Sequence, residues 1–425
     1  MTVKVTIKSG QEGSLRALLE RIDDGISGEN PLPFASLETI HFMRWVVLDA
    51  NPTKNLPASL VLSTNYDGPE KAHLEELESK AGPILRQIYT HCEGYDSKNL
   101  CRYLRKHRVP YAAFYVGTTG RSVKLIKEEA KLRTKIQDYL DGNPPGGGES
   151  PAQIRSRIIG FVQGDPTLEW ACSPPTYWAW YIFNYSLPIG ILLAYLAVCV
   201  FVPLFTPLAW WVFPVASILA VVVPVVVLAA LVSRQEKRDP VDPPVSDINK
   251  VADLADQEDE KVQNQLTHLV DIKPQWFRPY ALWVVLKSIN FLARYRYITG
   301  DLGGIPTIHF ARWVIIDGRR LLFFSNYDGS WVNYLGDFID KAAVGLTAVW
   351  SNTEGCPKAK EFVRAGAKDE QRFKAWTRNH QVFTDVWYSA YPELTVDNIN
   401  NNSFLRIGLA GQPNAEETVK WLSRF

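Results

Sequence analysis

Charged residues are missing from a long stretch in the middle of this 425-residue chain. No Asp, Glu, Lys or Arg lies between Trp170 and Ser233. A bilayer core about 30 Å thick needs about 20 apolar residues in a helix, so this stretch is long enough for two crossings. We therefore predict a transmembrane helical hairpin over residues 177–233, with spans from Tyr177 to Val202 and from Leu208 to Val232. The alternative is a buried core hairpin of a soluble protein, but soluble cores seldom run this far without a charge.

The flanks of this stretch predict its orientation. Pro203 and Pro207 bracket the reversal, because proline removes a backbone donor and ends a continuing helix. Amphipathic rings that favour the headgroup layer lie near the proposed ends, at Trp178, Trp180, Tyr181, Trp210 and Trp211. Arginine and lysine flank the stretch on both sides, whereas the turn around Phe205 carries no charge. The positive-inside rule therefore predicts a multi-pass membrane protein with both soluble halves on the cytoplasmic side.

Several sequence motifs are also absent, and this limits the reactions and partners that we expect. The five cysteines form no CxxC pair, which argues against a zinc site or a disulfide framework. No Walker A loop, GxGxxG, HExxH, GxSxG or CxxCH motif occurs where its chemistry would need it, so nucleotide-dependent and common hydrolytic reactions are not expected. The formal net charge is only +1 and no basic arm is present, so we expect no nucleic acid partner. Met1–Gly10 lacks an apolar core, so we expect no signal peptide.

Short sequence words recur in the same order on both sides of the uncharged stretch. They are TVKVTIK and THLVDIK (residues 2–8 and 267–273), TIHFMRWVVLD and TIHFARWVIID (39–49 and 307–317), and NYDG (65–68 and 326–329). Alternation of apolar residues predicts strands and helical spacing predicts helices, in the order β-α-β-β-α-β in each half. The internal repeat therefore predicts an α+β fold. We expect duplicated ferredoxin-like halves that pack their sheets together as an α/β barrel.

Changes in composition along the chain predict the boundaries between its segments. We expect a first ferredoxin-like half over 1–142, a linker over 143–176, the transmembrane hairpin over 177–233, a charged flexible tether over 234–264 and a second ferredoxin-like half over 265–425. The first helix of the second half, Trp276–Tyr297, is basic and aromatic. Two interpretations of it stay open, namely a helix on the membrane surface and a helix packed on the sheet.

Histidines occupy matching positions in the repeat. His41 and His309 lie in the TIHFxRWV strands, and His107 and His380 precede the last strand of each half. A histidine between two packed sheets could ligate a metal or haem, or transfer protons. Alternatively it is a structural residue bonded to a neighbour, and its presence in both halves favours that interpretation.

Arginine and aspartate recur as well. A buried arginine needs a carboxylate, so we expect Arg44 to pair with Asp67 and Arg312 to pair with Asp328 at the turns. The functional alternative is that these arginines and aspartates form the charged distal side of a cavity. Polar and aromatic groups without a counterpart in the first half follow the second turn, so we expect any function in the C-terminal half.

The duplicated layout resembles the dimeric α/β-barrel superfamily, which includes the chlorite dismutase-like and dye-decolourising peroxidase families. The resemblance covers residues 1–140 and 265–425. It implies a haem pocket in the C-terminal half, with His309 or His380 as the axial ligand and with Arg312 and Asp328 on the open side.

The chain departs from the dye-decolourising peroxidases at their GxxDG word, because Thr64 and Ser325 stand where its first glycine would be. The TIHFARW and NYDGSW words also resemble an uncharacterised group of bacterial membrane-associated proteins.

Three functional hypotheses remain. The first is a haem-dependent peroxidase-like oxidoreductase acting on an apolar or membrane-derived substrate. The second is a non-enzymatic protein that binds a lipid or another apolar small molecule. The third is a membrane-associated scaffold. All three have the lipid bilayer as a partner, and association into a homo-oligomer stays open.

Overall fold

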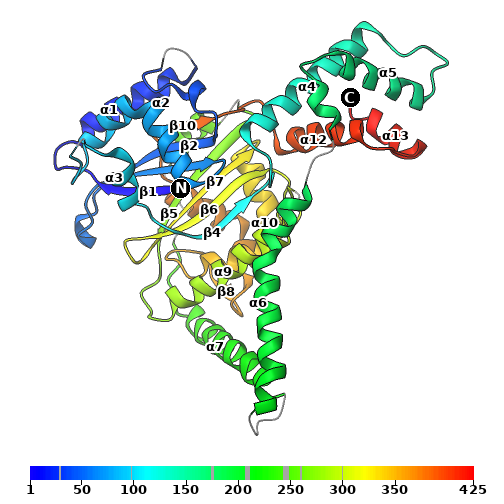
Figure 1. Cartoon of the computed structure of the whole chain (residues 1–425). Coiled ribbons are helices and arrows are strands. Elements are labelled where there is room, and N and C mark those ends of the chain that lie inside the picture. Colours follow the sequence, from blue (N-terminus) through cyan, green and yellow to red (C-terminus); the bar gives the residue numbers. More distant parts are fainter. Residues whose placement is uncertain are drawn as a thin grey trace. The chain divides into compact units, whose positions relative to one another are not determined.

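The computed structural model describes residues 1–27, 30–96, 98–173, 177–205, 211–242, 248–258, 261–298 and 300–425 (Figure 1). They form two compact units. The first contains Met1–Ala130 and Arg238–Asn400, and the second contains Lys131–Lys237 and Asn401–Phe425. Both sequence repeats therefore lie in the first unit. Only residues 131–142 and 401–425, at the ends of the two predicted halves, belong to the second unit.

The first unit is α+β and contains two antiparallel four-stranded sheets (Figure 1). In spatial order, the first sheet consists of β1 (Thr2–Thr6), β3 (Ser59–Tyr66), β2 (Ile40–Leu48) and β10 (Val386–Ser389). The second sheet consists of β4 (Tyr111–Val116), β6 (Ile308–Ile316), β7 (Arg320–Asp328) and β5 (Gln263–Asp271). A two-stranded ribbon joins β8 (Ala359–Lys360) to β9 (Arg364–Ala365).

The two halves exchange their last strands. Strand β10 of the second half pairs with β2, where Tyr388 lies opposite Met43, and β4 of the first half pairs with β6, where Tyr115 lies opposite Ala311. The expectation that each half completes its own sheet is therefore wrong. The two sheets also stay open, so the expected barrel does not form.

Helices cover the outer face of each sheet. Those of the first half are α1 (Glu12–Asp24), α2 (Glu70–Thr90) and α3 (Leu100–Lys106), and those of the second half are α9 (Arg278–Tyr295), α10 (Trp331–Trp350) and α11 (Glu370–His380). The unit also contains α8 (Ile248–Glu258) and the 3₁₀ turns η1 (Gly25–Ser27), η2 (Phe34–Ser36), η3 (Pro52–Lys54) and η5 (Gly366–Lys368). Alternation along β2 explains the layers: Trp45 packs with the helices, whereas Val46 packs with Val314 of the other sheet.

The predicted flexible tether is attached to the first unit at two points. Asp239 is buried and lies 2.7 Å from the Nζ atom of Lys273, and it also pairs with Arg278. Glu258, at the end of α8, lies 2.7 Å from Arg378. Part of the segment between residues 234 and 264 is therefore ordered by ion pairs.

The second unit is helical. It contains the end of α4 (Val123–Gly142), then α5 (Pro151–Gly164), η4 (Glu169–Cys172), α6 (Tyr177–Phe205) and α7 (Val212–Glu236), and finally the end of α12 (Val396–Ala410) and α13 (Ala415–Leu422). Apolar side chains of α4, α5, α12 and α13 form its core, including Ile136, Ile158, Leu405 and Trp421. Ser150 and Asn414 begin α5 and α13 with capping boxes, so local sequence determines where these helices start.

Two helices of this unit are long and apolar enough to cross a membrane, at Asn184–Val202 and Val212–Glu236. Their most apolar windows are 0% and 6% buried, which differs from the core helices of soluble proteins. Two apolar helices were predicted from this stretch, and the structure contains them. The predicted start of the second span at Leu208, together with Pro207 and Trp210, lies outside the described residues.

Candidate functional site

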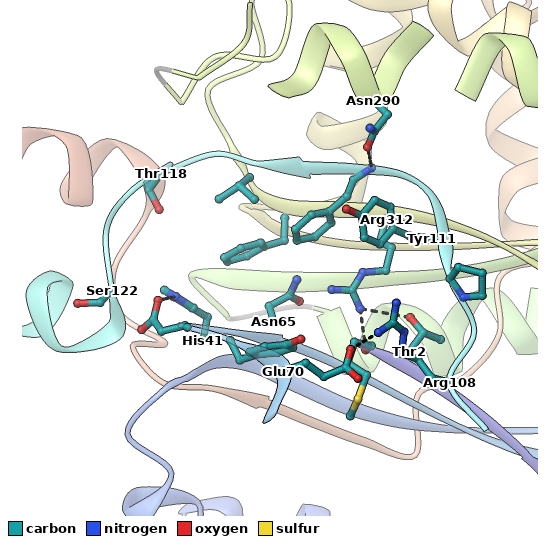
Figure 2. Close-up of a pocket in the computed structure, with 18 of the residues that line it drawn as sticks. Thr2, His41, Asn65, Glu70, Arg108, Tyr111, Thr118, Ser122, Asn290 and Arg312 are labelled. Atoms are coloured by element: carbon teal, nitrogen blue, oxygen red, sulfur yellow. Dashed lines mark hydrogen bonds and ion pairs between the residues drawn. The ribbon is translucent and has the colours of Figure 1, made fainter. Parts of the chain in front are cut away.

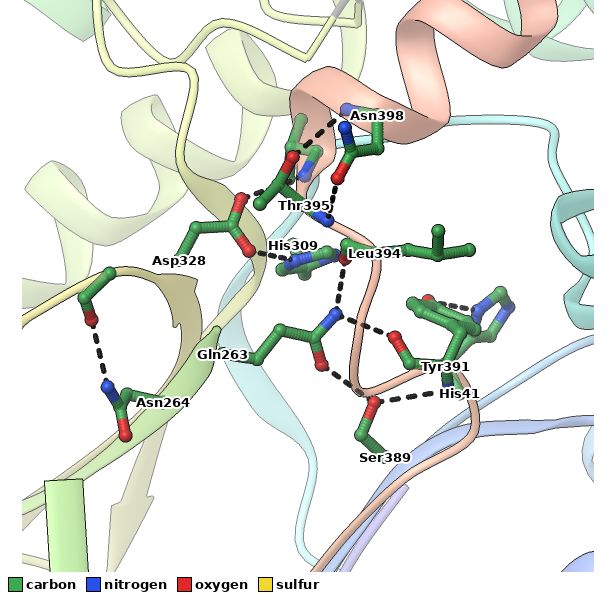
Figure 3. Close-up of polar contacts among 12 residues, drawn as sticks. His41, Gln263, Asn264, His309, Asp328, Ser389, Tyr391, Leu394, Thr395 and Asn398 are labelled. Atoms are coloured by element: carbon green, nitrogen blue, oxygen red, sulfur yellow. Dashed lines mark hydrogen bonds and ion pairs between the residues drawn. The ribbon is translucent and has the colours of Figure 1, made fainter. Parts of the chain in front are cut away.

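The histidines of the repeat pair with the aspartates of the NYDG turns, and Figure 3 shows the pair formed by His309 and Asp328. The Nε2 atom of His41 lies 3.0 Å from the Oδ1 atom of Asp67, and that of His309 lies 2.6 Å from the Oδ1 atom of Asp328. Both histidines lie where the pairing of their strand with its neighbour is shifted in register. Such a bulge changes the direction of a side chain, which brings each ring to the turn.

The second carboxylate oxygen of each aspartate accepts a hydrogen bond from the backbone N–H of the first residue of a helix. Asp67 accepts from Val123 at the start of α4, and Asp328 accepts from Val396 at the start of α12, both at 2.8 Å. A carboxylate at a helix N-terminus satisfies an unpaired donor and interacts favourably with the helix dipole. This duplicated His–Asp–helix contact supports the structural interpretation of the two histidines.

The arginines of the repeat do not pair with these aspartates. Arg312 reaches across to the first sheet and donates to the carbonyls of Met1 at 2.8 Å and Thr64 at 3.0 Å. Arg44 reaches the opposite way, to the carbonyls of Leu266 and Ser325. The expected Arg–Asp pairs are therefore wrong, because alternation directs the arginines into the space between the sheets.

These two guanidinium groups are buried cations without a carboxylate partner among the described residues. Burial lowers the pKa of Arg44 to about 9 and that of Arg312 to about 10. Both groups also donate to side-chain oxygens: Arg44 to Gln265, Thr267 and Asn326, and Arg312 to Thr2 and Ser63. The Nε atom of Arg312 is buried and has no hydrogen-bond partner within the part of the chain that the structure describes.

Arg312 lies on the wall of a cavity of about 810 Å³ (Figure 2). Figure 2 shows its guanidinium between Asn65, Tyr111 and Thr2. Other lining cations are Arg108, Arg121 and Lys287, and lining rings are Tyr66, Tyr111, Phe114 and Phe310. Glu70, which also lines the cavity, is paired with Arg108. The cavity therefore combines positive charge with aromatic surface.

Helix α9 forms one side of this cavity through Lys287 and Asn290. The side-chain oxygen of Asn290 accepts a hydrogen bond of 3.1 Å from the backbone N–H of Phe114, which fixes α9 beside β4. Most of the other lining residues belong to the first half. This cavity thus lies mainly against the first half, whereas any function was expected in the C-terminal half.

The other predicted site residues lie elsewhere. His309 and Asp328 contact each other, and the ring of His309 packs 5.3 Å from that of Phe42. His380, on α11, packs 5.8 Å from His268 on the outer side of the second sheet, and its Nδ1 atom lies 3.0 Å from the carbonyl of Trp376. Neither His309 nor His380 lines the cavity at Arg312.

His309 does not fit an axial haem ligand. It is fully buried, its Nε2 atom is taken by Asp328, and it does not line the cavity at Arg312. The described residues also contain no group of three or more His, Cys, Asp or Glu side chains that could hold a metal ion. The geometry therefore gives no coordination position for haem at the Nε2 atom of His309, and haem ligation by His380 stays a prediction.

Several cavity residues were not identified from the sequence. Arg108 and Tyr111 come from one segment and Lys287 and Asn290 from another, and they form no motif. The one available signal was the basic, aromatic composition of the helix that contains Lys287. No protein-family model, curated protein or solved structure matches this chain, so the resemblance to haem-binding barrel families stays a prediction from the sequence.

Proposed function

We propose that this chain is a membrane-anchored binding protein whose cavity holds an amphipathic organic anion. The observation that carries this proposal is Arg312, a buried guanidinium on the cavity wall with one N–H direction unused. A buried charge without a counterion is unfavourable, and an anionic ligand would supply the missing partner.

The remaining lining residues indicate the class of ligand. Lys287 adds positive charge, whereas the charge of Arg108 is balanced by Glu70, and Tyr111 and Phe114 add ring surface. A cavity of about 810 Å³ is in the usual range for small-molecule sites. We propose a ligand with a carboxylate or phosphate head and an acyl or aromatic body.

The two apolar helices supply the anchor. We propose that α6 and α7 cross the bilayer, because their apolar side chains are exposed along the length that a bilayer requires. Binding is favoured over haem-dependent oxidation because the cavity presents arginine and aromatic rings but neither His309 nor His380.

The test compares two buried arginines. Binding of laurate, dodecyl phosphate and the neutral dodecanol would be measured by equilibrium dialysis with the full chain in a non-ionic detergent. We expect one or both anions to bind and Arg312→Gln to weaken binding by about tenfold or more, because a hydrogen bond to a charged group is lost.

Arg44→Gln is the matched control, because Arg44 is equally buried and also bridges the sheets but does not line the cavity. It should retain binding. Equal binding by Arg312→Gln and the unaltered chain, or equal binding of dodecanol and the anions, would contradict the proposal. Preference for laurate or for dodecyl phosphate would identify the head group.

A further inference from the structure

Helix α9 carries an exposed aromatic and basic face. We call it the α9 stripe. It consists of Tyr280, Trp283, Lys287, Phe291 and Arg294 on the helix and of Trp276 in the turn that precedes it. Spacings of three and four residues place these side chains on one side of a helix. Its rings are more than half exposed: Trp276 66%, Tyr280 61%, Trp283 53% and Phe291 58%. Such a cluster of exposed rings on one helix requires an explanation.

The opposite face of α9 already supplies the contacts that the fold needs. Ala281, Leu282, Leu286 and Ala293 are buried in the core of the second sheet. The stripe is therefore not part of that core. The structure therefore confirms the interpretation of this helix as packed on the sheet, and its other face stays exposed.

We infer that the α9 stripe lies on the surface of a bilayer that contains anionic lipids. Trp and Tyr side chains favour the headgroup layer, since their rings are apolar and their N–H and O–H groups are polar. The Nζ atom of Lys287 lies 5.9 Å from the ring of Trp283, so charge and ring occupy the same part of the face. Interfacial helices combine these residue types.

Charge complementarity favours a lipid surface over a second copy of this chain. No acidic residue lies between Asp271 and Asp301, so the stripe carries cations and no carboxylate. Two copies joined through this face would bring Lys287 and Arg294 against like charges. Anionic headgroups would instead attract both. The inference does not require the cavity to be occupied.

The experiment locates lipid contacts by photo-cross-linking. Benzoylphenylalanine would replace Phe291 or Tyr280 in the full chain, reconstituted in nanodiscs of POPC with POPG or of POPC alone. The control position is Lys71 on α2, whose side chain is 79% exposed in the same unit. Mass spectrometry would measure lipid adducts after irradiation.

We expect adducts at positions 291 and 280 at about five times the yield at position 71 or more, and a lower yield without POPG. Charge reversal by Lys287→Glu together with Arg294→Glu should reduce the yield at position 280. Thermal unfolding like that of the unaltered chain shows that each variant is folded. Adduct yields equal to those at position 71, or cross-links to a second copy of the chain, would overturn the inference.

Discussion

At the scale of single residues, the two halves use different partners for the same turn tyrosine. The ring of Tyr66 stacks on His73 at 3.8 Å between centroids, and the ring of Tyr327 stacks on Tyr334 at 3.9 Å. The Nε2 atom of His73 also lies 2.9 Å from the Thr64 hydroxyl. Burial, with a smaller effect of the positive N-terminus, lowers the pKa of His73 to about 3.

This histidine makes stability depend on pH. It is neutral in the folded chain down to a pH of about 3, whereas in the unfolded chain it takes up a proton below its ordinary value of 6.5. The contribution of neutral His73 to the free energy of unfolding is therefore complete above pH 6.5 and is lost as the pH falls toward about 3. We predict that His73→Phe flattens this acid dependence.

Urea unfolding followed by tryptophan fluorescence, at several pH values in that window, measures the effect. Burial also lowers the pKa of His268, so it acts in the same direction and part of the acid dependence should remain in the single variant. Parallel pH profiles for His73→Phe and the unaltered chain would show that His73 does not contribute.

At the scale of helices and strands, the duplicated aspartates act on two different helices. We predict that Asp328→Asn destabilises the start of α12 and that Asp67→Asn destabilises the start of α4. The expected cost is about 1–2 kcal/mol each, because a charged partner is lost at the helix N-terminus. Each variant serves as the control for the other, because Asp328→Asn should affect only α12 and Asp67→Asn only α4.

Hydrogen exchange measured by mass spectrometry is suited to this test. Faster exchange should appear in the first turn of α12 for the Asp328 variant and in the first turn of α4 for the Asp67 variant. Unchanged protection in both helices would mean that the carboxylate charge adds nothing to the hydrogen bond.

Local patterns predicted many of these elements. Alternation in the words at residues 39–49 and 307–317 predicts strands, and these words contain β2 and β6. Alternation shows which face of a strand is buried but not which strand lies beside it. The exchange of β4 and β10 therefore could not be predicted, since it depends on contacts between distant parts of the chain.

The candidate site was less predictable than the strands. Arg312 was selected, but for a pairing with Asp328 that the structure does not contain. The bulge at His309 turns the histidine to that aspartate, and no pattern in a single sequence identifies such a bulge. The cavity itself is built from six segments of the chain that approach only after folding.

At the scale of the whole molecule, the proposed membrane hairpin predicts a topology. Arg234 lies in the last turn of the second apolar helix, and Lys237 and Arg238 follow it, so both flanks should remain in the cytoplasm. We predict that alkaline phosphatase is active when fused after Phe205 and inactive when fused after Phe425. Green fluorescent protein should give the reverse result at these two positions in a bacterial host. Activity of the same reporter at both positions would contradict the hairpin.

The strand exchange also affects how the chain folds during synthesis. Val386 of β10 pairs with Trp45 of β2, so the edge of the first sheet has no partner until most of the chain has left the ribosome. An open edge can pair with other chains, and contacts between distant residues form slowly. Neither half can therefore finish folding while the other is still being made. The helices α6 and α7 emerge before the first unit is complete, so a nascent chain held at the translocation machinery would be kept apart from its neighbours during this vulnerable period.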